Sequence, residues 1–452
     1  FLGAGMLSDI SAQDFSLQAD TLNEARLPAQ WDLQSCIDYA LEQNITIRKN
    51  RVTAESTQID VKTAKAALLP SLSFSTSQQV VNRPYQETSS RVSGNEIISS
   101  NSKTSYNGNY GLNASWTIYN GSKRLKTLKQ ERLNNQVAEL DIATSENTIK
   151  ESIAQIYIQI LYAAESVRVN ENTLQVSIAQ RDRGQELLNA GSIAKSDFAQ
   201  LEAQVSTDRY QLVTAQATLQ DYKLQLKQLL ELDGENEMNV YLPNLSDENV
   251  LAPLPAKKDV YVSALAIRPE IEASKLNVEA SELGIDIAKS SYFPTISLSA
   301  GIGTNHTSGS DFTFGEQVKN GWNNSIGVSV SVPIFNNRQT KSAVQKAKLQ
   351  RETSLLSLLD EQKTLYKTIE GLWLDANSAQ QRYAAANEKL RSTQISYDLI
   401  SEQFNLGMRN TVELLTEKNN LLQAQQEQLQ AKYMAILNTQ LLKFYQGDKL
   451  TL

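Results

Sequence analysis

The stretch SLSFSTSQQV at residues 71–80 places polar residues, mostly serine, at odd positions and larger, mainly apolar ones at even positions. The stretch SIGVSVSV at residues 325–332 has the same alternation. Successive side chains of a strand point to opposite faces, so each stretch predicts a strand with one apolar and one polar face. Similar alternation surrounds Trp116 and Leu298. The sequence therefore predicts two hairpins, with four strands at residues 71–82, 106–119, 295–303 and 324–335.

These strands are about as long as a tilted strand that crosses a bilayer. An apolar outer face and an inner face of Ser and Asn are typical of a water-filled membrane barrel. For one such strand taken alone, a half-buried sheet in a soluble domain is the better explanation. Four strands in two matching hairpins favour the barrel. The residues expected to face lipid include Leu112, Trp116, Val328 and Val330.

Composition limits the possible classes of protein. The chain has 452 residues, enough for several ordinary domains, and its 40% hydrophobic content argues against wholesale disorder. A net charge of −7 without a basic patch predicts no nucleic-acid partner. No run of about 18 apolar residues is present, so the sequence predicts no transmembrane helix.

The N-terminal region raises the question of processing. Residues 1–13, FLGAGMLSDISAQ, are similar to the end of a signal peptide, and Ala12 is a plausible residue before the cleavage site. Leu33-Gln34-Ser35-Cys36 superficially matches a lipoprotein processing site. The stretch before it is polar, so we expect Cys36 to be buried in a helix and not lipidated.

The chain is an internal repeat. Pro70 and Pro294 each follow a helical segment and precede a hairpin, and Gly191 and Gly407 occupy matching positions much further on. The first repeat is placed at residues 14–230, an equatorial connector at 231–260 and the second repeat at 261–447. Each repeat is expected to contain a helix, a hairpin, a very long helix, a Gly turn and a return helix.

The very long helices are predicted at residues 122–189 and 337–405, neither of which contains proline. Each spans about 100 Å at 1.5 Å per residue. A narrow apolar seam predicts coiled-coil packing. Gly191 and Gly407 supply the left-handed conformation that ends each helix. Shorter return helices are expected at 193–232 and 410–445. A plain coiled-coil rod is the alternative, but it does not explain the strands.

The chain resembles the TolC-type outer-membrane efflux proteins. The likeness rests on WDLQSCIDYALEQN at residues 31–44, on ALLPSL at 67–72, and on the residues around Gly191 and Gly407. Four strands alone cannot close a pore, because the smallest membrane barrels have eight. Several chains must therefore share one barrel. The resemblance implies that the number is three.

The resemblance implies a passive export duct: a homotrimer with a twelve-stranded outer-membrane barrel and a periplasmic α-barrel tunnel. Such a duct receives substrates from an inner-membrane pump of the RND or ABC type through a periplasmic adaptor, or membrane fusion protein. Efflux and type I secretion both remain open at this stage. The expected location is the outer membrane of a Gram-negative cell, in contact with its lipid and extending into the periplasm.

Candidate functional residues lie at the helix turns. The resemblance implies that Asp197 and Glu413 constrict the periplasmic aperture, and that Phe404 and Arg409 lock the return helix against its neighbour. The alternative is that the two acids merely favour the N-terminal dipoles of their helices. The exposed tips that meet the adaptor are expected at Gly191, Ser192, Gly407 and Met408.

No catalytic set is visible in the sequence. A single histidine, His306, and a single cysteine exclude His-based triads with partners and multi-His or multi-Cys metal sites within one chain. We therefore expect no enzyme activity, no cofactor and no metal. A barrel-anchored structural or adhesive coiled-coil protein remains the alternative function, although it does not require the duplicated Gly turns.

Overall fold

The computed structural model describes residues 28–85, 89–93, 96–100, 103–233, 238–243, 250–308, 310 and 312–451. The expected signal-peptide remnant at 1–13 lies outside these residues. The chain divides into two compact units. A sheet unit contains Arg48–Ser145 and Ala264–Lys367, and a helical unit contains Phe1–Ile47, Glu146–Ser263 and Thr368–Leu452. Among the described residues, no helix combines the length and the apolar character needed to cross a bilayer.

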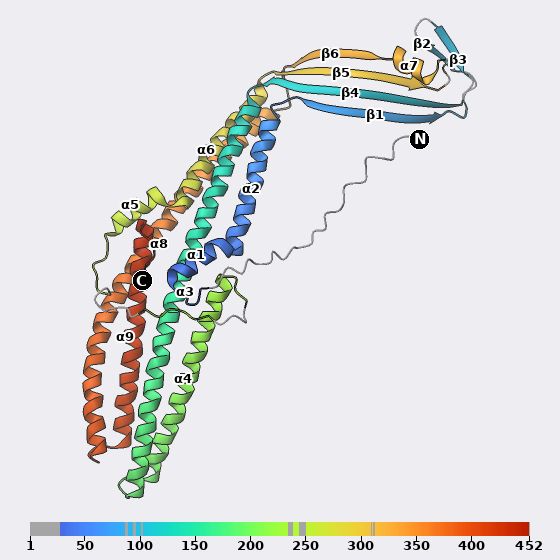
Figure 1. The fold of residues 1–452 in the computed structure, drawn as a ribbon. Coiled ribbons are helices and arrows are strands. Elements are labelled where there is room, and N and C mark those ends of the chain that lie inside the picture. The colour runs from blue at the N-terminus through green and yellow to red at the C-terminus, as the bar shows by residue number, and fades with distance from the viewer. Residues whose placement is uncertain are drawn as a thin grey trace. The chain divides into compact units, whose positions relative to one another are not determined.

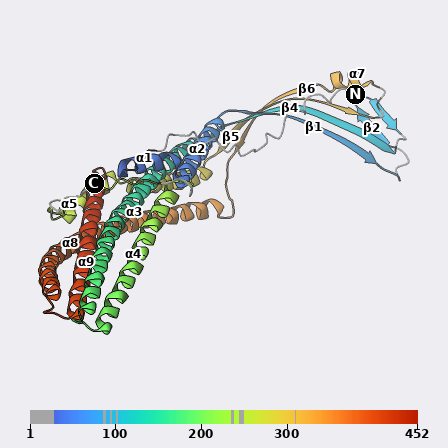
Figure 2. The ribbon, with the colours of Figure 1, turned by 60° about the horizontal axis from the view of Figure 1, so that its bottom comes forward.

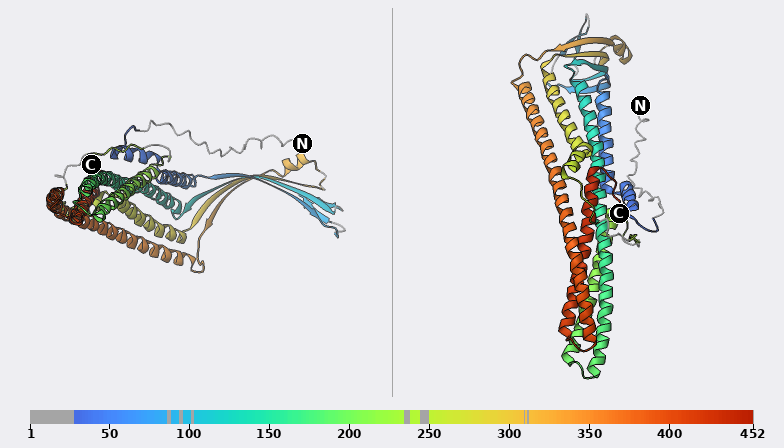
Figure 3. Two further views of the ribbon diagram at one scale, coloured as in Figure 1. Left: turned by 90° about the horizontal axis from the view of Figure 1, so that it is seen from below. Right: turned by 90° about the vertical axis from the view of Figure 1, so that its left-hand side faces the viewer.

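The sheet unit is built on a four-stranded antiparallel sheet (Figure 1). Its strands are β1 (Ser71–Asn82), β4 (Thr104–Asn120), β5 (Thr295–Thr307) and β6 (Asn323–Ser331), in the order β1-β4-β5-β6. The second strand of the first repeat thus pairs with the first strand of the second repeat. Figure 3 shows that the sheet is strongly twisted along its strands, as expected from the handedness of the L-residue backbone.

The strand register separates two chemically different faces. Leu72, Ala114, Ala300 and Ile326 lie in one row across all four strands. The neighbouring row, on the opposite face, consists of Ser73, Asn113, Gly301 and Ser325. We call these the apolar face and the polar face of the sheet. Hydrogen bonds link side chains across the polar face, including Ser71 Oγ to Ser115 Oγ at 2.8 Å and Asn109 Nδ2 to Ser77 Oγ at 3.3 Å.

The predicted alternation is wrong at two places. A bulge between Thr117 and Tyr119 puts Tyr119 opposite Ile296, so Ile118 does not continue the apolar row. Strand β6 ends at Ser331, whereas the expected strand extended to residue 335 and included Val332 and Ile334. Pro333 accounts for the early end, because proline has no N–H to donate to a neighbouring strand.

Two small elements were not predicted. A second hairpin, β2 (Ser89–Ser93) with β3 (Glu96–Ser100), follows β1. Helix α7 (Phe314–Asn320) lies between β5 and β6 and begins with a capping box. The Thr313 N–H donates to Glu316 Oε2 at 2.8 Å, and the Glu316 N–H donates to Thr313 Oγ1 at 3.4 Å.

Each outgoing strand turns into its long helix through two consecutive residues with positive φ. The pair is Gly121 and Ser122 (φ 66° and 62°) before α3 (Lys123–Asn189), and Asn337 and Arg338 (φ 51° and 65°) before α8 (Gln339–Asn405). Three of these four residues carry a Cβ, which makes the left-handed conformation unfavourable. Ser290 Oγ donates to the Gly121 carbonyl at 2.8 Å and holds the first turn in place.

Two further helices complete the sheet unit. They are α6 (Pro269–Lys289) and most of α2 (Ile45–Ala66), which lead into β5 and β1 respectively. Lys126 Nζ and Gln130 Nε2 of α3 donate to backbone carbonyls of α6, at 3.3 Å and 2.9 Å. These bonds connect the long helix of the first repeat to the helix that leads into the second hairpin.

The helical unit contains α1 (Leu33–Gln43), α4 (Lys195–Leu229), most of α5 (Lys257–Ile267), α9 (Thr411–Gln446), and the later parts of α3 and α8. Figure 2 shows the α3–α4 and α8–α9 hairpins side by side, with both turns at the same end of the unit. The connector at residues 250–257 lies against α8, where Trp373 Nε1 donates to the Pro255 carbonyl at 3.1 Å and Gln380 Nε2 to the Ala252 carbonyl at 2.8 Å.

Candidate functional site

The two helix turns have the same backbone geometry. Gly191 and Gly407 both have φ of 73°, the left-handed conformation that favours glycine. The N–H of Ser192 donates to the Leu187 carbonyl at 2.8 Å, and the N–H of Met408 donates to the Gln403 carbonyl at 2.9 Å. These six-to-one bonds are Schellman caps, which satisfy the last carbonyls of α3 and α8. The described tips present Gly191, Ser192, Gly407 and Met408 to solvent, and the Met408 side chain is 71% exposed.

Phe404 is buried between the two hairpins, although it comes only three residues before Gly407. Its side chain is 2% exposed and packs with Leu201 of α4 and Leu414 of α9. Gly184 lets α4 approach α3 closely at this level, because a Cβ there would lie 2.3 Å from Leu201 Cδ1. The cluster of Leu201, Phe404 and Leu414 therefore joins three helices just behind the tip.

The two acidic candidates occupy the first turns of the return helices. Asp197 lies in α4, and its carboxylate accepts a hydrogen bond from the Ala194 N–H at 3.4 Å. Glu413 lies in α9, where its own N–H donates to the N-cap side chain of Asn410 at 2.9 Å. Both carboxylates thus lie near the positive end of a helix dipole.

Arg409 pairs with an acid of its own chain. Its Nη1 lies 3.3 Å from Glu413 Oε1, and its Nε donates to Gln403 Oε1 at 2.8 Å. Both charged side chains of the pair are partly exposed, so the pair itself contributes only about 0–1 kcal/mol to stability. Arg409 nevertheless connects the end of α8 to the start of α9 across the Gly turn.

The residues expected to face lipid all lie on the apolar face of the sheet. Leu112 pairs with Ile302, Trp116 pairs with Leu298, and Leu298 in turn pairs with Val328. Val330 lies opposite Ile296. Large apolar side chains are exposed on this face, and Val328 is 65% exposed. An exposed apolar surface of this extent normally marks an interface with membrane or with another protein.

Cys36 lies in the first turn of α1, next to the N-cap residue Asp32. Its side chain is fully buried, and this burial, reinforced by the charge of Asp32, raises the pKa of the thiol to about 12. Because the protonated thiol is shielded from solvent, this cysteine is a packing residue of the helical unit.

In the described part of the chain, no group of three or more His, Cys, Asp or Glu side chains converges in a way that could hold a metal ion. His306 is surrounded by aromatic rings, at 5.2 Å from Tyr106 and 5.1 Å from Phe314 between centroids. At the two turns, the described contacts are the Schellman caps, the Arg409–Glu413 pair and the apolar cluster around Phe404.

The sequence analysis missed one feature of the helical unit. Lys418 of α9 is buried and pairs with Asp208 of α4. The available signal was its spacing: Lys418 falls on the same helical stripe as Leu414 and Leu421, both of which are buried. A charged residue at an apolar position of a seam indicates a buried partner.

Comparison with solved structures identifies the fold of the chain. The outer-membrane channel CmeC of Campylobacter jejuni superposes with a TM-score of 0.76 at 18% identity, covering 93% of this chain and 87% of that chain. The described elements therefore have the fold of an outer-membrane channel subunit.

Sequence comparison then gives the family. A profile of the outer membrane efflux protein family matches residues 36–231 and 260–447, and the chain belongs to that family. The two matched segments correspond to the duplication seen in the sequence. Membership places the protein in the outer membrane, within a family of export channels.

Individual relatives are distant. The outer membrane efflux protein BepC of Brucella suis is 26% identical over 294 residues, which span 65% of this chain and 61% of that protein. The outer membrane protein TolC of Escherichia coli is 23% identical over 421 residues, which span 90% of this chain and 80% of TolC.

Proposed function

We propose that the chain is one protomer of a homotrimeric channel-tunnel that conducts substrates passively through the outer membrane. The observation that carries the proposal is the open, two-faced sheet. In the described sheet, β1 and β6 each pair on one side only. Unpaired strand edges are not tolerated in lipid, so neighbouring chains must cover them.

The polar face supports an open lumen and a trimer. Its central rows contain only Ser, Asn and Gly. Eight strands form a barrel whose interior is just wide enough for side chains to fill it. Small side chains lining a ring of twelve strands leave a water-filled passage. The apolar face then contacts membrane lipid.

The helices carry further surfaces for neighbouring protomers. Apolar side chains at helical spacing are exposed on α4, at Tyr210 and Val213, and on α8, at Ile395 and Leu399. Packing of these stripes against adjacent chains produces a closed ring of coiled coils. This ring is the periplasmic tunnel that continues the barrel.

We propose that the aperture residues act at the tip of this tunnel. Three copies of Asp197 and three of Glu413 create a negative ring that attracts cations and resists closer approach. Arg409 tempers this charge through its pair with Glu413, and Phe404 fixes the end of α8 against the α4 and α9 helices.

The exposed tips fit a role in docking. Leu406 and Met408 are exposed apolar side chains on an otherwise polar turn. We propose that Gly191, Ser192, Gly407 and Met408 contact a periplasmic adaptor, which couples the duct to an inner-membrane pump of the RND or ABC type. In this arrangement the pump selects the substrate and the duct performs no chemistry of its own.

The test is conductance of the purified oligomer in a planar bilayer, combined with its mass in detergent by light scattering. We expect a trimer that conducts ions with cation preference. A monodisperse folded monomer contradicts the proposal. A stable trimer that does not conduct supports the structural or adhesive alternative instead.

A further inference from the structure

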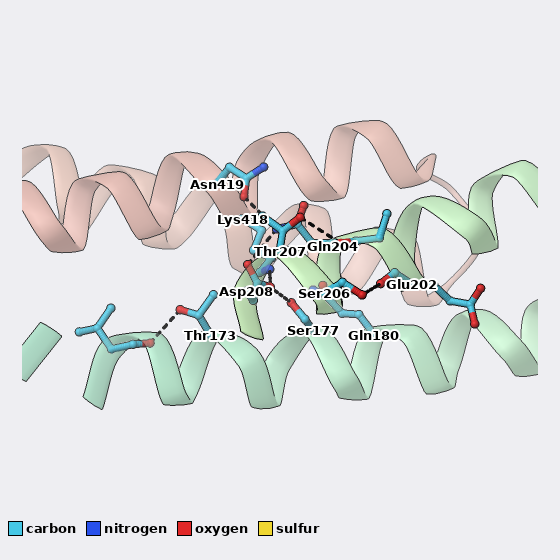
Figure 4. A network of polar contacts seen from close by, with 12 residues as sticks. Thr173, Ser177, Gln180, Glu202, Gln204, Ser206, Thr207, Asp208, Lys418 and Asn419 are labelled. Carbon is cyan, nitrogen blue, oxygen red and sulfur yellow. Dashed lines mark hydrogen bonds and ion pairs between the residues drawn. The ribbon is translucent and has the colours of Figure 1, made fainter. Parts of the chain in front are cut away.

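A buried polar cluster connects the two hairpins of the helical unit. Its members are Ser177 of α3, Gln204 and Asp208 of α4, and Lys418 of α9 (Figure 4). The Asp208 carboxylate accepts hydrogen bonds from all three other residues, and the Gln204 bond measures 2.9 Å. Figure 4 shows Asp208 between the Ser177 hydroxyl and the Lys418 ammonium group.

The ion pair is almost completely removed from water. The side chains of Asp208 and Lys418 are 1% and 3% exposed, whereas those of Lys389 and Glu427, which pair α8 with α9, are 44% and 42% exposed. Burial lowers the pKa of Lys418, while its bond to Asp208 acts in the opposite direction. Two charges held in this way attract each other strongly, because little water screens them.

The pair lies some distance behind the turns. Lys418 lies about two helical turns, or roughly 10 Å, beyond the start of α9 at Thr411. The aperture candidates are therefore outside the cluster. Separation of α9 from α4 at this level leaves the charges of Asp208 and Lys418 without partners. The free-energy cost of two unpaired charges is large where water is excluded.

The surroundings of Lys418 nonetheless allow this separation. A cavity of about 110 Å³ borders the Lys418 side chain; Asn172, Thr173 and Gln425 contribute polar groups to a lining that is otherwise mainly apolar. A water molecule needs only roughly 10–15 Å³ of such volume and two to four polar partners. Water in this cavity can therefore solvate the Lys418 ammonium group when that group separates from Asp208. An ion pair that is buried beside such a cavity holds α4 against α9 and still allows the two helices to separate.

We propose that Asp208, Lys418 and Ser177 form a releasable lock that holds the α8–α9 hairpin against the α3–α4 hairpin in the resting protomer and so sets the resting aperture. The inference rests on the proposed channel function. These are positioning residues, since their place in the fold is behind the aperture.

The test compares the resting conductance of matched variants in a planar bilayer. Lys418→Met and Asp208→Asn each remove one side of the pair and are expected to raise resting conductance several-fold. The exchanged pair Asp208→Lys with Lys418→Asp is expected to restore low conductance. Lys389→Met is the control, because its pair with Glu427 joins α8 to α9 within one hairpin.

A covalent tether distinguishes the lock from a general loss of packing. Gln204 Nε2 lies 3.4 Å from Asn419 Oδ1, so cysteines at these two positions face each other across α4 and α9. In the Lys418→Met background, a short bis-methanethiosulfonate reagent forms a disulfide with each of Gln204→Cys and Asn419→Cys as two methanesulfinate groups leave. This tether should return conductance to the parent value, and a reductant that cleaves the disulfides should raise it again. Cys36 is buried and does not compete for the reagent.

The inference is overturned if folded Lys418→Met and Asp208→Asn trimers conduct like the parent, or if the tether leaves a raised conductance unchanged. Should these variants fail to assemble, Ser177→Ala removes one hydrogen bond from Asp208 and must still raise conductance. A parent trimer that does not conduct refutes the proposed function instead.

Discussion

Strand β6 offers two adjacent positions that test the orientation of the sheet in the membrane. Val328 lies on the apolar face opposite Leu298, and Ser329 lies on the polar face opposite Ser297. We predict that Val328→Arg destabilises the folded trimer by about 2–4 kcal/mol, the cost of an arginine on the lipid face near the midplane. This range shifts the folding equilibrium roughly 30- to 700-fold.

Ser329→Arg is the matched control, because it adds the same side chain one residue further along the same strand. On the polar face the guanidinium group stays in water, so we expect normal folding and a reduced conductance for cations.

The assay is urea-dependent unfolding from lipid vesicles, followed by tryptophan fluorescence, with conductance measured on the same preparations. Equal destabilisation by the two substitutions refutes the assigned orientation. A fully stable Val328→Arg trimer shows that the apolar face does not contact lipid.

Four further predictions concern the helix turns at Gly191 and Gly407 and the strand-to-helix turn at Asn337. Arg409→Ser should raise resting conductance at an unchanged melting temperature, since its partly exposed pair with Glu413 contributes only about 0–1 kcal/mol to stability. Combined Asp197→Ala and Glu413→Ala should reduce cation preference and block by multivalent cations, as measured by reversal potentials. Phe404→Ala should destabilise the helical unit by about 3–5 kcal/mol through a cavity, measured by denaturant unfolding. Asn337→Gly should stabilise the trimer by about 1 kcal/mol in thermal unfolding, because glycine adopts its positive φ without strain.

Each of these predictions has a contrary outcome. A parent-like conductance for Arg409→Ser, or unchanged selectivity without the two acids, places the constriction elsewhere. Hydrogen exchange at the tip that is unaffected by Phe404→Ala shows that the cluster is not a structural anchor. A lower melting temperature for Asn337→Gly means that the asparagine side chain makes compensating contacts.

The sequence predicted the elements whose signals are periodic. Alternation over Ser71–Val80 identified a strand, and a glycine after a long proline-free stretch identified each helix end. The predicted strand faces and strand ends were wrong where the alternation is locally broken. The bulge at Thr117–Tyr119 inserts a residue without changing the composition, and Pro333 ended β6 although Val332 and Ile334 continued the apolar pattern.

The candidate site was less accessible from sequence than the fold. Gly191 and Gly407 were identifiable because a left-handed residue favours glycine. The burial of Phe404 among Leu201 and Leu414 depends on contacts between residues far apart in the chain. The Asp208–Lys418 pair joins residues 210 positions apart, and no local pattern specifies which of 50 acidic residues meets this lysine.

The pairing of β4 with β5 has a consequence for how such a duct can be assembled. This antiparallel contact joins the last strand of one repeat to the first strand of the next. In the proposed ring, β6 pairs antiparallel with β1 of the next chain. This pairing between chains then has the same arrangement as the β4–β5 pairing within a chain. The trimer is then pseudo-sixfold, and a chain of a single repeat could build an equivalent ring from six copies. Duplication frees the two copies of each turn to diverge: one uses Gly121-Ser122, the other Asn337-Arg338.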